Sequence, residues 1–401
     1  MRDRVPMRLL LILGMSSAFG PLSMDAYLPA LPALGRSLHA SPSAVGATLT
    51  SCVLGLSIGQ LVLGPVSDAL GRRRPLLAGL AVYTAASVAC ALAPTIWLLI
   101  LFRLVQGLAG AAGIVIARAI ARDRYSGVAL ARFIGLMLAV TGAAPILAPV
   151  LGAALLHVTS WRGIFIGLAA IIAALFAAAA LWLEESLPEE LRHPPGLGST
   201  FGAFAHLLGD RSFVGYALSG ALPFGALFAY VSASPYVLED IHGVSAQLFG
   251  VIFAVNALGI VAAARATALL VHRFGARRLL AAGLLLCAAG GLELLGDVLV
   301  GGGLAGLLPG FFLVISSFGL LGPNAVALAL AEHPRTAGSA SALLGATQFV
   351  VGAAVAPLVG VAGSRSAVPM AVVIAVCSCF ALLPFTLLTR REAPQPDTIA
   401  A

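Results

Sequence analysis

Long apolar segments separated by short polar ones recur along the whole chain. Each is close to the roughly 20 mostly apolar residues that a membrane-spanning helix needs. The pattern therefore predicts an all-α integral membrane protein with twelve membrane-spanning helices. The predicted spans lie at about 8–30, 44–66, 75–93, 96–117, 130–156, 161–183, 213–236, 245–270, 278–299, 303–330, 338–361 and 367–389.

The longest polar gap divides these segments into two sets of six. Acids and prolines cluster between Glu184 and Arg211, a composition typical of a loop. A second observation also favours two related halves, because His272–Arg278 after the eighth segment echoes Leu70–Arg74 after the second. The expected organisation is an N-terminal six-helix bundle (1–183), a cytoplasmic linker (184–212) and a C-terminal six-helix bundle with a short cytoplasmic tail (213–401).

The arginines are distributed unevenly over the two sides of the predicted membrane protein. With the N-terminus in the cytoplasm, eighteen arginines lie inside or at the inner boundary, whereas Arg36, Arg162 and Arg365 lie outside. An excess of basic residues in cytoplasmic loops sets the orientation of most membrane proteins. The sequence thus predicts a multi-pass protein of the cell inner membrane with both termini in the cytoplasm.

The composition excludes several classes of function. The chain is 60% hydrophobic and only 10% charged, which a soluble domain could not tolerate. Its net charge of +7 is dispersed over short loops, so we expect no nucleic-acid partner. We find no phosphate-binding motif for ATP, no metal-ligand spacing and no catalytic constellation, so we expect neither an enzyme nor a cofactor.

Asp25 is the first candidate for chemistry, because it lies near the outer end of the first predicted span. A carboxylate inside a membrane costs at least about 2.5 kcal/mol at the bilayer centre, so it should face a cavity or a partner. A carboxyl group whose access to water changes can bind and release a proton. We expect Asp25 to couple proton movement; the plainer interpretation is an interfacial acid at a helix end.

Arg103 is the second candidate and lies about 10 Å inside the fourth predicted span. An arginine at this depth is too far in to reach water easily, which favours a function over simple snorkelling. It stays charged, so we expect it to tune a proton-binding acid such as Asp25 rather than carry the proton. Gln106 follows one helical turn later and shares its face.

Three charged residues at the inner surface form a second constellation. Asp68 ends the second span, Arg72 follows a turn at Gly71, and Asp123 lies just beyond the fourth span. We call Asp68, Arg72 and Asp123 the Arg72 latch, and we expect Arg72 to bridge the two carboxylates when the cytoplasmic side closes. A surface ion pair contributes only about 0–1 kcal/mol, which suits a contact that breaks in each cycle.

The fifth span and several aromatic residues offer further candidates. Prolines four residues apart, flanked by small residues, predict a kinked helix that packs closely against a neighbour. These positions are Gly142, Pro145, Pro149 and Gly152. Aromatic and polar residues that could line a substrate cavity, although packing explains each one singly, are Tyr27, Gln106, Phe224, Phe228, Tyr230, Phe318 and Asn324.

Three of these motifs resemble signatures of the drug/proton antiporters of the major facilitator superfamily. They are the Asp68–Arg74 loop, the Arg103–Gly107 segment and the proline-glycine run at Thr141–Ala153, although Ala69 stands where the family usually has arginine. Further segments are similar to the Bcr/CflA group within that family. These are Met24–Pro32, Gln60–Asp68, Arg118–Asp123, Trp161–Arg162 and Ala337–Ala342.

The resemblance implies two six-helix bundles around a central cavity. It also implies export of bicyclomycin, chloramphenicol and related small drugs in exchange for protons. The expected partners are therefore a small-molecule drug, protons and the lipid bilayer, with the protein a monomer. Two alternatives stay open: a metabolite or nutrient carrier of the same fold, including uptake by proton symport, and a membrane receptor without transport.

Overall fold

The computed structural model describes residues 7–125, 127–192, 197–331, 333, 337–355, 357–360 and 366–389. All regular structure in these ranges is helical. The α-helices of twelve or more residues are α1 (Met7–Asp25), α3 (Pro42–Leu70), α4 (Arg73–Leu92), α5 (Ile96–Arg124), α6 (Gly127–Val158), α7 (Trp161–Trp182), α8 (Leu197–Gly209), α9 (Arg211–Pro235), α10 (Ala246–Phe274), α11 (Ala276–Val300), α12 (Leu304–Ser316), α13 (Phe318–Ala331), α14 (Ala337–Val355) and α15 (Val368–Phe380). The shorter elements are η1 (Leu28–Ala30), α2 (Leu31–Ser37), η2 (Glu189–Leu191), η3 (Tyr236–Ile241), η5 (Leu358–Gly360) and α16 (Leu382–Leu387).

The helices have the length and composition of membrane spans. Nine in the described ranges are long and apolar enough to cross a membrane, and the bent pair Met7–Gly20 and Leu22–Ser37 adds a tenth. Shorter apolar stretches in α6 and α14 are Leu147–Val158 and Leu343–Val355. Each of the twelve predicted segments overlaps one of these helices, so the predicted all-α membrane fold is confirmed, and the count of twelve stays a prediction.

The first predicted span is broken, whereas the sequence pattern predicted a continuous helix over 8–30. α1 ends at Asp25, and η1 and α2 follow after a turn. Pro29 and Pro32 occupy the first turns of η1 and α2, where their missing N–H groups are tolerated. A proline also disfavours helical geometry at the residue before it, so the prolines explain why α1 does not continue.

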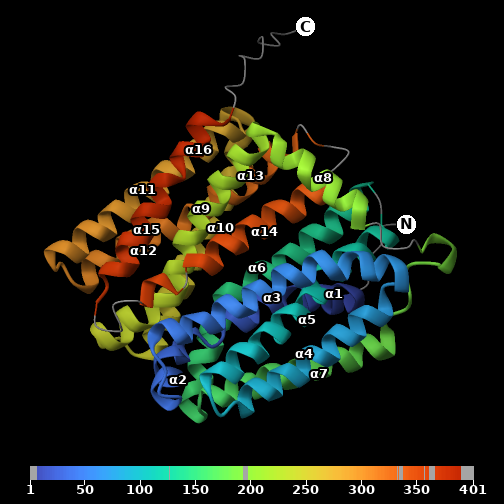
Figure 1. The fold of residues 1–401 in the computed structure, drawn as a ribbon, viewed down its shortest axis with the longest axis horizontal. Coiled ribbons are helices and arrows are strands. Elements are labelled where there is room, and N and C mark those ends of the chain that lie inside the picture. The colour runs from blue at the N-terminus through green and yellow to red at the C-terminus, as the bar shows by residue number, and fades with distance from the viewer. Residues whose placement is uncertain are drawn as a thin grey trace, which may run out of the picture.

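The helices form two groups in space. Figure 1 shows α1–α7, coloured blue to green, in one part of the molecule and α9–α16, coloured yellow-green to red, in the other. We call these the N-terminal group and the C-terminal group. Where they meet, α3 packs against α14 and α6 packs against α10.

The two groups end their second long helix in the same way. Gly71 follows α3 with φ +85°, and Gly275 follows α10 with φ +77°. Residues with a side chain rarely adopt this backbone geometry, so glycine is required at each turn. The sequence echo between Leu70–Arg74 and His272–Arg278 thus corresponds to a shared local structure.

Among the described residues, the polar contacts between the groups lie toward one end of the molecule. Arg36 of α2 pairs with Asp240 of η3, and we call this the Arg36 end. α3 begins near this end, at Pro42, and runs for 29 residues to the turn before Arg72. Its length is about 44 Å. We call the opposite end the Arg72 end.

α3 and α5 approach so closely that their backbones nearly touch. A Cβ atom at Gly107 of α5 would lie 2.0 Å from the carbonyl oxygen of Cys52 in α3, and one at Gly55 would lie 2.2 Å from the carbonyl oxygen of Leu104. Small residues allow such approach between membrane helices. This contact fixes the part of α5 that carries Arg103.

Candidate functional site

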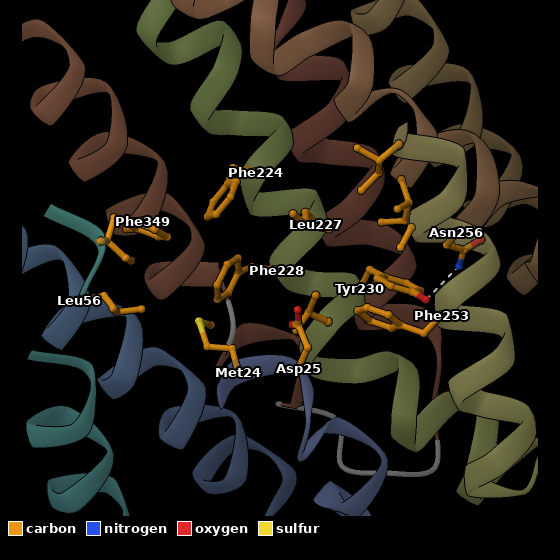
Figure 2. A pocket seen from close by; sticks show the side chains of 15 residues that line it. Met24, Asp25, Leu56, Phe224, Leu227, Phe228, Tyr230, Phe253, Asn256 and Phe349 are labelled. Atoms are coloured by element: carbon orange, nitrogen blue, oxygen red, sulfur yellow. Dashed lines mark hydrogen bonds between the residues drawn. The ribbon is translucent and has the colours of Figure 1, made fainter. Parts of the chain in front are cut away.

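A cavity of about 290 Å³ lies between the two groups of helices (Figure 2). The N-terminal group contributes four lining side chains, and the C-terminal group contributes the rest, most of them from α9 and α10. The lining is mainly apolar and aromatic, which is typical of sites for small organic molecules. The lining residues are Met24, Asp25, Leu56, Ile114, Phe224, Leu227, Phe228, Tyr230, Val231, Phe253, Asn256, Ala257, Ile260, Ile315 and Phe349.

Among the residues that the structure describes, Asp25 is the only charged side chain that lines this cavity. It is the last residue of α1, so the helix break directs its carboxylate to the cavity, where it points toward the space between Phe228 and Tyr230 (Figure 2). Within the described residues, no hydrogen bond or ion pair holds this carboxylate. Since an unpaired carboxylate in apolar surroundings is costly, the site favours a bound proton or a cationic partner there.

Tyr230 and Asn256 supply the other polar atoms of the lining. The Asn256 side-chain amide donates a hydrogen bond to the Tyr230 hydroxyl at 2.9 Å, which links α9 to α10. Tyr230 also stacks on Phe253, with ring centroids 5.5 Å apart. The pair thus presents a polar edge beside an aromatic surface.

A second group of aromatic rings lines the cavity beside α14. The Phe224 and Phe228 centroids lie 5.1 Å apart, and Phe349 of α14 meets Phe224 edge-on at 5.5 Å. These rings come from two helices of the C-terminal group. They offer flat faces for an aromatic or aliphatic molecule.

The structure places some of the predicted cavity residues here and others elsewhere. Phe224, Phe228 and Tyr230 line the cavity. Tyr27 does not, because its ring is fully buried within the N-terminal group and its hydroxyl bonds to Thr48 at 2.9 Å.

Gln106, Phe318 and Asn324 are also absent from the lining of this cavity. Gln106 is buried and donates to the Ser87 hydroxyl at 2.7 Å. Asn324 donates to the carbonyl of Leu320 within its own helix at 2.7 Å, and Phe318 begins α13. Sequence reasoning did not select Met24, Phe253 or Phe349, whose apolar side chains carry no signal that separates lining from packing.

Arg103 is fully buried and does not pair with Asp25. Its Nη1 group donates to the carbonyl of Ser23 at 3.2 Å and to the side-chain oxygen of Gln106 at 2.5 Å. Its guanidinium lies 4.5 Å from the centroid of the Tyr27 ring. Arg103 therefore contacts α1 through the backbone two residues before Asp25, where the sequence had suggested a carboxylate partner.

Arg72 lies at the centre of a network at the Arg72 end. Its Nε donates to Asp123 at 3.0 Å, and its Nη1 donates to Asp68 at 2.5 Å and to the Ser67 hydroxyl at 2.8 Å. Burial acts to lower the pKa of Arg72, but the two carboxylates outweigh it and raise that pKa. All these partners belong to the N-terminal group, so the Arg72 latch does not itself join the two groups.

Glu185 is part of this network and was not selected from the sequence. Its carboxylate accepts backbone N–H groups from Arg72 at 2.8 Å, Arg73 at 3.1 Å, Ser186 at 3.0 Å and Leu187 at 3.1 Å. Partial burial acts to raise the pKa of Glu185, but these donors outweigh it and hold that pKa below its usual range.

Glu185 also explains the glycine at the turn of the Arg72 latch. A Cβ atom at Gly71 would lie 2.6 Å from its Oε2, so the turn requires glycine for space as well as for its φ. The signal for this contact in the sequence is the acid pair Glu184–Glu185 directly after a span, which does not reveal which acid turns inward.

The fifth-span motif lies on α6. Pro149 is buried, and a Cβ atom at Gly152 would lie 1.7 Å from the carbonyl oxygen of Ala26, so α6 passes very close to the break in α1. Gly142 and Pro145 also fall within α6, and their surroundings lie outside the described part of the structure. Because Gly152 has no side chain, α6 can pack against the backbone of Ala26, the residue that follows Asp25.

The comparisons with known proteins agree with one another on one protein family. A family model described as Major Facilitator Superfamily matches residues 13–357. An uncharacterized MFS-type transporter of Bacillus subtilis is 39% identical over 390 residues, covering 96% of each chain. A bicyclomycin resistance protein homolog of Haemophilus influenzae is 30% identical over 385 residues, again covering 96% of each.

Another relative and a solved structure extend this comparison. A chloramphenicol resistance protein of Pseudomonas aeruginosa is 31% identical over 277 residues, covering 68% of this chain and 64% of its own. The crystal structure of a D-xylose-proton symporter superposes with a TM-score of 0.76 at 15% identity, covering 96% of this chain and 98% of the symporter. At that identity, the likeness concerns the fold alone.

Proposed function

The chain belongs to the Major Facilitator Superfamily and is a transporter, and we propose that it exports small drugs across the cytoplasmic membrane in exchange for protons. One observation carries this proposal: an unpaired carboxylate, Asp25, faces an apolar and aromatic cavity between two groups of helices. The names of the bicyclomycin and chloramphenicol resistance relatives support the direction of transport and the kind of substrate.

The proposal includes a topology. Twelve spans form two six-helix halves, residues 1–183 and 213–401, joined by a cytoplasmic linker at 184–212. The Arg72 end faces the cytoplasm together with both termini, because most arginines then lie inside. The cavity lies where the two halves meet, as expected for alternating access in this fold.

The structure corresponds to a state that is closed at the Arg36 end. Among the described residues, the polar contacts between the two groups lie toward this end. They are the ion pair of Arg36 with Asp240, and hydrogen bonds from Tyr236 to the Leu31 carbonyl, from Ser43 to the Pro357 carbonyl and from Thr50 to the Ala353 carbonyl. We assign this state to the inward-facing part of the cycle, in which drug enters from the cytoplasm.

In this mechanism, Asp25 interacts with either a proton or the drug, depending on the conformational state of the transporter. A proton that arrives from outside neutralises the carboxylate, and its release inside lets the cavity accept the next drug molecule. Arg103 acts as a positioning residue, because it holds α1 through the Ser23 carbonyl next to the break. The Arg72 latch fixes the α3–α4 turn to α5, and we propose that it supports the closure of the cytoplasmic side later in the cycle.

A metabolite or nutrient carrier is the alternative function. Of the fifteen described residues that line the cavity, only Asp25, Tyr230 and Asn256 have side chains with oxygen or nitrogen atoms. A sugar would leave most of its hydroxyl groups without partners in such a cavity, and each unpaired buried group costs about 1–3 kcal/mol. The lining therefore favours an apolar drug over a polyol.

Proton flux in inside-out vesicles tests the proposal. With an acidified lumen, adding chloramphenicol or bicyclomycin should release protons from vesicles that hold the wild-type protein. Vesicles that hold Asp25→Asn at the same level should release none, whereas Asp25→Glu should keep part of the signal. A drug-induced release that persists unchanged in Asp25→Asn would remove Asp25 from the coupling step.

A further inference from the structure

A groove lies on the surface of the N-terminal group, between α3 and α4. Each of these two helices packs closely against α5 but only loosely against the other, so α5 forms the floor of the groove. The volume of the groove is about 350 Å³. It shares no lining residue with the cavity that contains Asp25, so it is a separate feature of the molecule.

The described lining of this groove is apolar except for one side chain. Leu70 of α3, Val82 of α4 and Leu108 of α5 line it, and all three are exposed. These helices have the length and composition of membrane spans. Exposed apolar side chains that gather on such helices mark a surface that contacts lipid or a partner.

Arg74 is the charged side chain of the groove and lies near the start of α4. It is exposed, and within the described part of the chain no hydrogen bond or ion pair engages its guanidinium. The two acids beside this turn are already occupied. Asp68 pairs with Arg72, and the Glu185 carboxylate accepts backbone N–H groups of the turn. Arg74 therefore offers a positive charge that no acid compensates.

The length of the groove matches one leaflet of a lipid bilayer. Val82 follows Arg74 by eight residues, which corresponds to about 12 Å along α4. The hydrocarbon core of a bilayer is about 30 Å thick, so one leaflet contributes about 15 Å. A molecule with an anionic group at Arg74 and an alkyl chain in the groove would thus lie parallel to the lipids around it.

From these features we infer that the groove binds one anionic phospholipid, with its phosphate at Arg74 and one acyl chain against Leu108 and Ala109. A guanidinium matches the geometry of a phosphate group and can contact two of its oxygens. Basic pockets between membrane helices on the cytoplasmic side recognise anionic head groups in this way. The inference goes beyond the proposed export function, from which it takes only the orientation that places the groove in the inner leaflet.

The dimensions of the groove favour a lipid chain over a helix of a second copy of this protein. An α-helix with its side chains is about 10 Å across, so 12 Å of its length would fill about 900 Å³. The groove offers about 350 Å³, which admits an alkyl chain and excludes a helix. Free phosphate would satisfy Arg74 but would leave the apolar part of the groove unfilled.

Native mass spectrometry of the purified full-length protein tests this inference. The protein is equilibrated in detergent with equal amounts of phosphatidylglycerol and of phosphatidylcholine with the same acyl chains. We expect the adduct with one phosphatidylglycerol to be at least five-fold more abundant than that with one phosphatidylcholine. Equal abundance of the two adducts overturns the inference.

Two variants and a matched control connect the adduct to the groove. Arg74→Gln should lower the phosphatidylglycerol adduct to the level of phosphatidylcholine. Arg278→Gln is the control, because Arg278 is exposed and follows Gly275 by three residues, as Arg74 follows Gly71, and it should keep the wild-type preference. Ala78→Phe fills the groove while Arg74 stays in place, so it should reduce both adducts.

Three results would contradict the assignment. A phosphatidylglycerol preference that survives in Arg74→Gln places the head group elsewhere. Displacement of the lipid by an equal concentration of inorganic phosphate shows that Arg74 recognises phosphate without the chain. A dimer that is present in wild type and lost in Ala78→Phe assigns the groove to a second copy.

The lipid measurement is independent of the proposed export function, because it involves no drug and no proton gradient. If the vesicles release no protons while phosphatidylglycerol binds through Arg74, the lipid site stands and proton-driven export fails. If chloramphenicol releases protons while the two lipids bind equally, export stands and the lipid site fails.

Discussion

Arg36 and Asp240 form an ion pair at 3.0 Å that joins the N-terminal group to the C-terminal group. Arg36 lies on α2, after the break in α1, and Asp240 lies on the π-helical turn η3 that continues α9. Both elements follow the first long helix of their group. The contact therefore reports directly on whether the two groups are closed at this end.

Breaking this pair should open the Arg36 end. An exposed ion pair contributes about 0–1 kcal/mol, so Asp240→Asn should raise the open population by up to about five-fold. The measurement is the rate at which a membrane-impermeant maleimide labels the thiol introduced by Ser43→Cys, whose position now bonds across the closed interface.

Exchange of the two charges is the control for this prediction. Arg36→Asp combined with Asp240→Arg should restore slow labelling, because the pair is re-formed in reverse. Fast labelling in the double variant would mean that the contact does not hold the end closed.

Glu185 should stabilise the segment after α7 more than its neighbour does. Glu185→Gln removes a charge that accepts four backbone N–H groups, whereas Glu184 is 87% exposed at its side chain. Trypsin should cleave after Arg192 faster in Glu185→Gln than in wild type, and Glu184→Gln should match wild type. Equal rates in the two variants would show that Glu185 does not hold the segment.

The stabilisation by the Glu185 carboxylate, which accepts four backbone N–H groups, should weaken as the pH falls. Because the native pKa of Glu185 is lowered, its stabilising contribution is complete above the usual carboxyl pKa and is lost as pH falls through the lower native value. The difference in unfolding temperature between wild type and Glu185→Gln should therefore be largest near neutral pH. It should shrink below about pH 4.

Arg103→Ala should abolish drug-coupled proton release, with a loss of at least ten-fold in the vesicle assay. The substitution leaves the Ser23 carbonyl without the donor that holds α1 beside Asp25. Arg265→Ala is the matched control, because Arg265 is an exposed arginine on α10. Coupling that survives in Arg103→Ala at normal expression would limit Arg103 to a packing role.

Gly107→Ala should destabilise the protein, because the new methyl group would meet the Cys52 carbonyl at 2.0 Å. Overpacking of this kind costs about 1–3 kcal/mol. Gly296→Ala on α11 is the control, since its methyl group would meet nothing within 4 Å. The unfolding temperature in detergent should fall by several degrees in the first variant and stay within about one degree in the second.

The helical segments could be predicted because repeated apolar runs of span length are typical of membrane-spanning helices and rare in soluble domains. The break after Asp25 was less visible, since Pro29 and Pro32 read equally well as the end of a span. The sequence indicates that these prolines interrupt a helix, but it does not indicate the direction of the chain after the break. The direction taken by α2, toward η3 of the other group, depends on how the two groups pack.

The residues of the candidate site also divide into those that a local sequence pattern predicts and those that only the packing of distant helices brings together. The motif that contains Asp68 and Arg72 places an arginine four residues after an acid, across a glycine turn, so the two residues are already close along the chain. Phe349 and Asn256 reach the cavity only through the packing of α14 and α10, which no local pattern encodes. Arg103 differs again, because the backbone carbonyl that it contacts has no residue-type signature.

The exposure of Arg36 has a consequence for how the protein senses its surroundings. Its side chain is 68% exposed, so dissolved ions reach the pair with Asp240 and weaken it, whereas the Arg72 side chain is only 9% exposed and is shielded. On the proposed orientation, we therefore expect higher salinity of the external medium to favour outward opening. The same change in ionic strength on the cytoplasmic side should affect the Arg72 latch less, because the Arg72 side chain is largely buried.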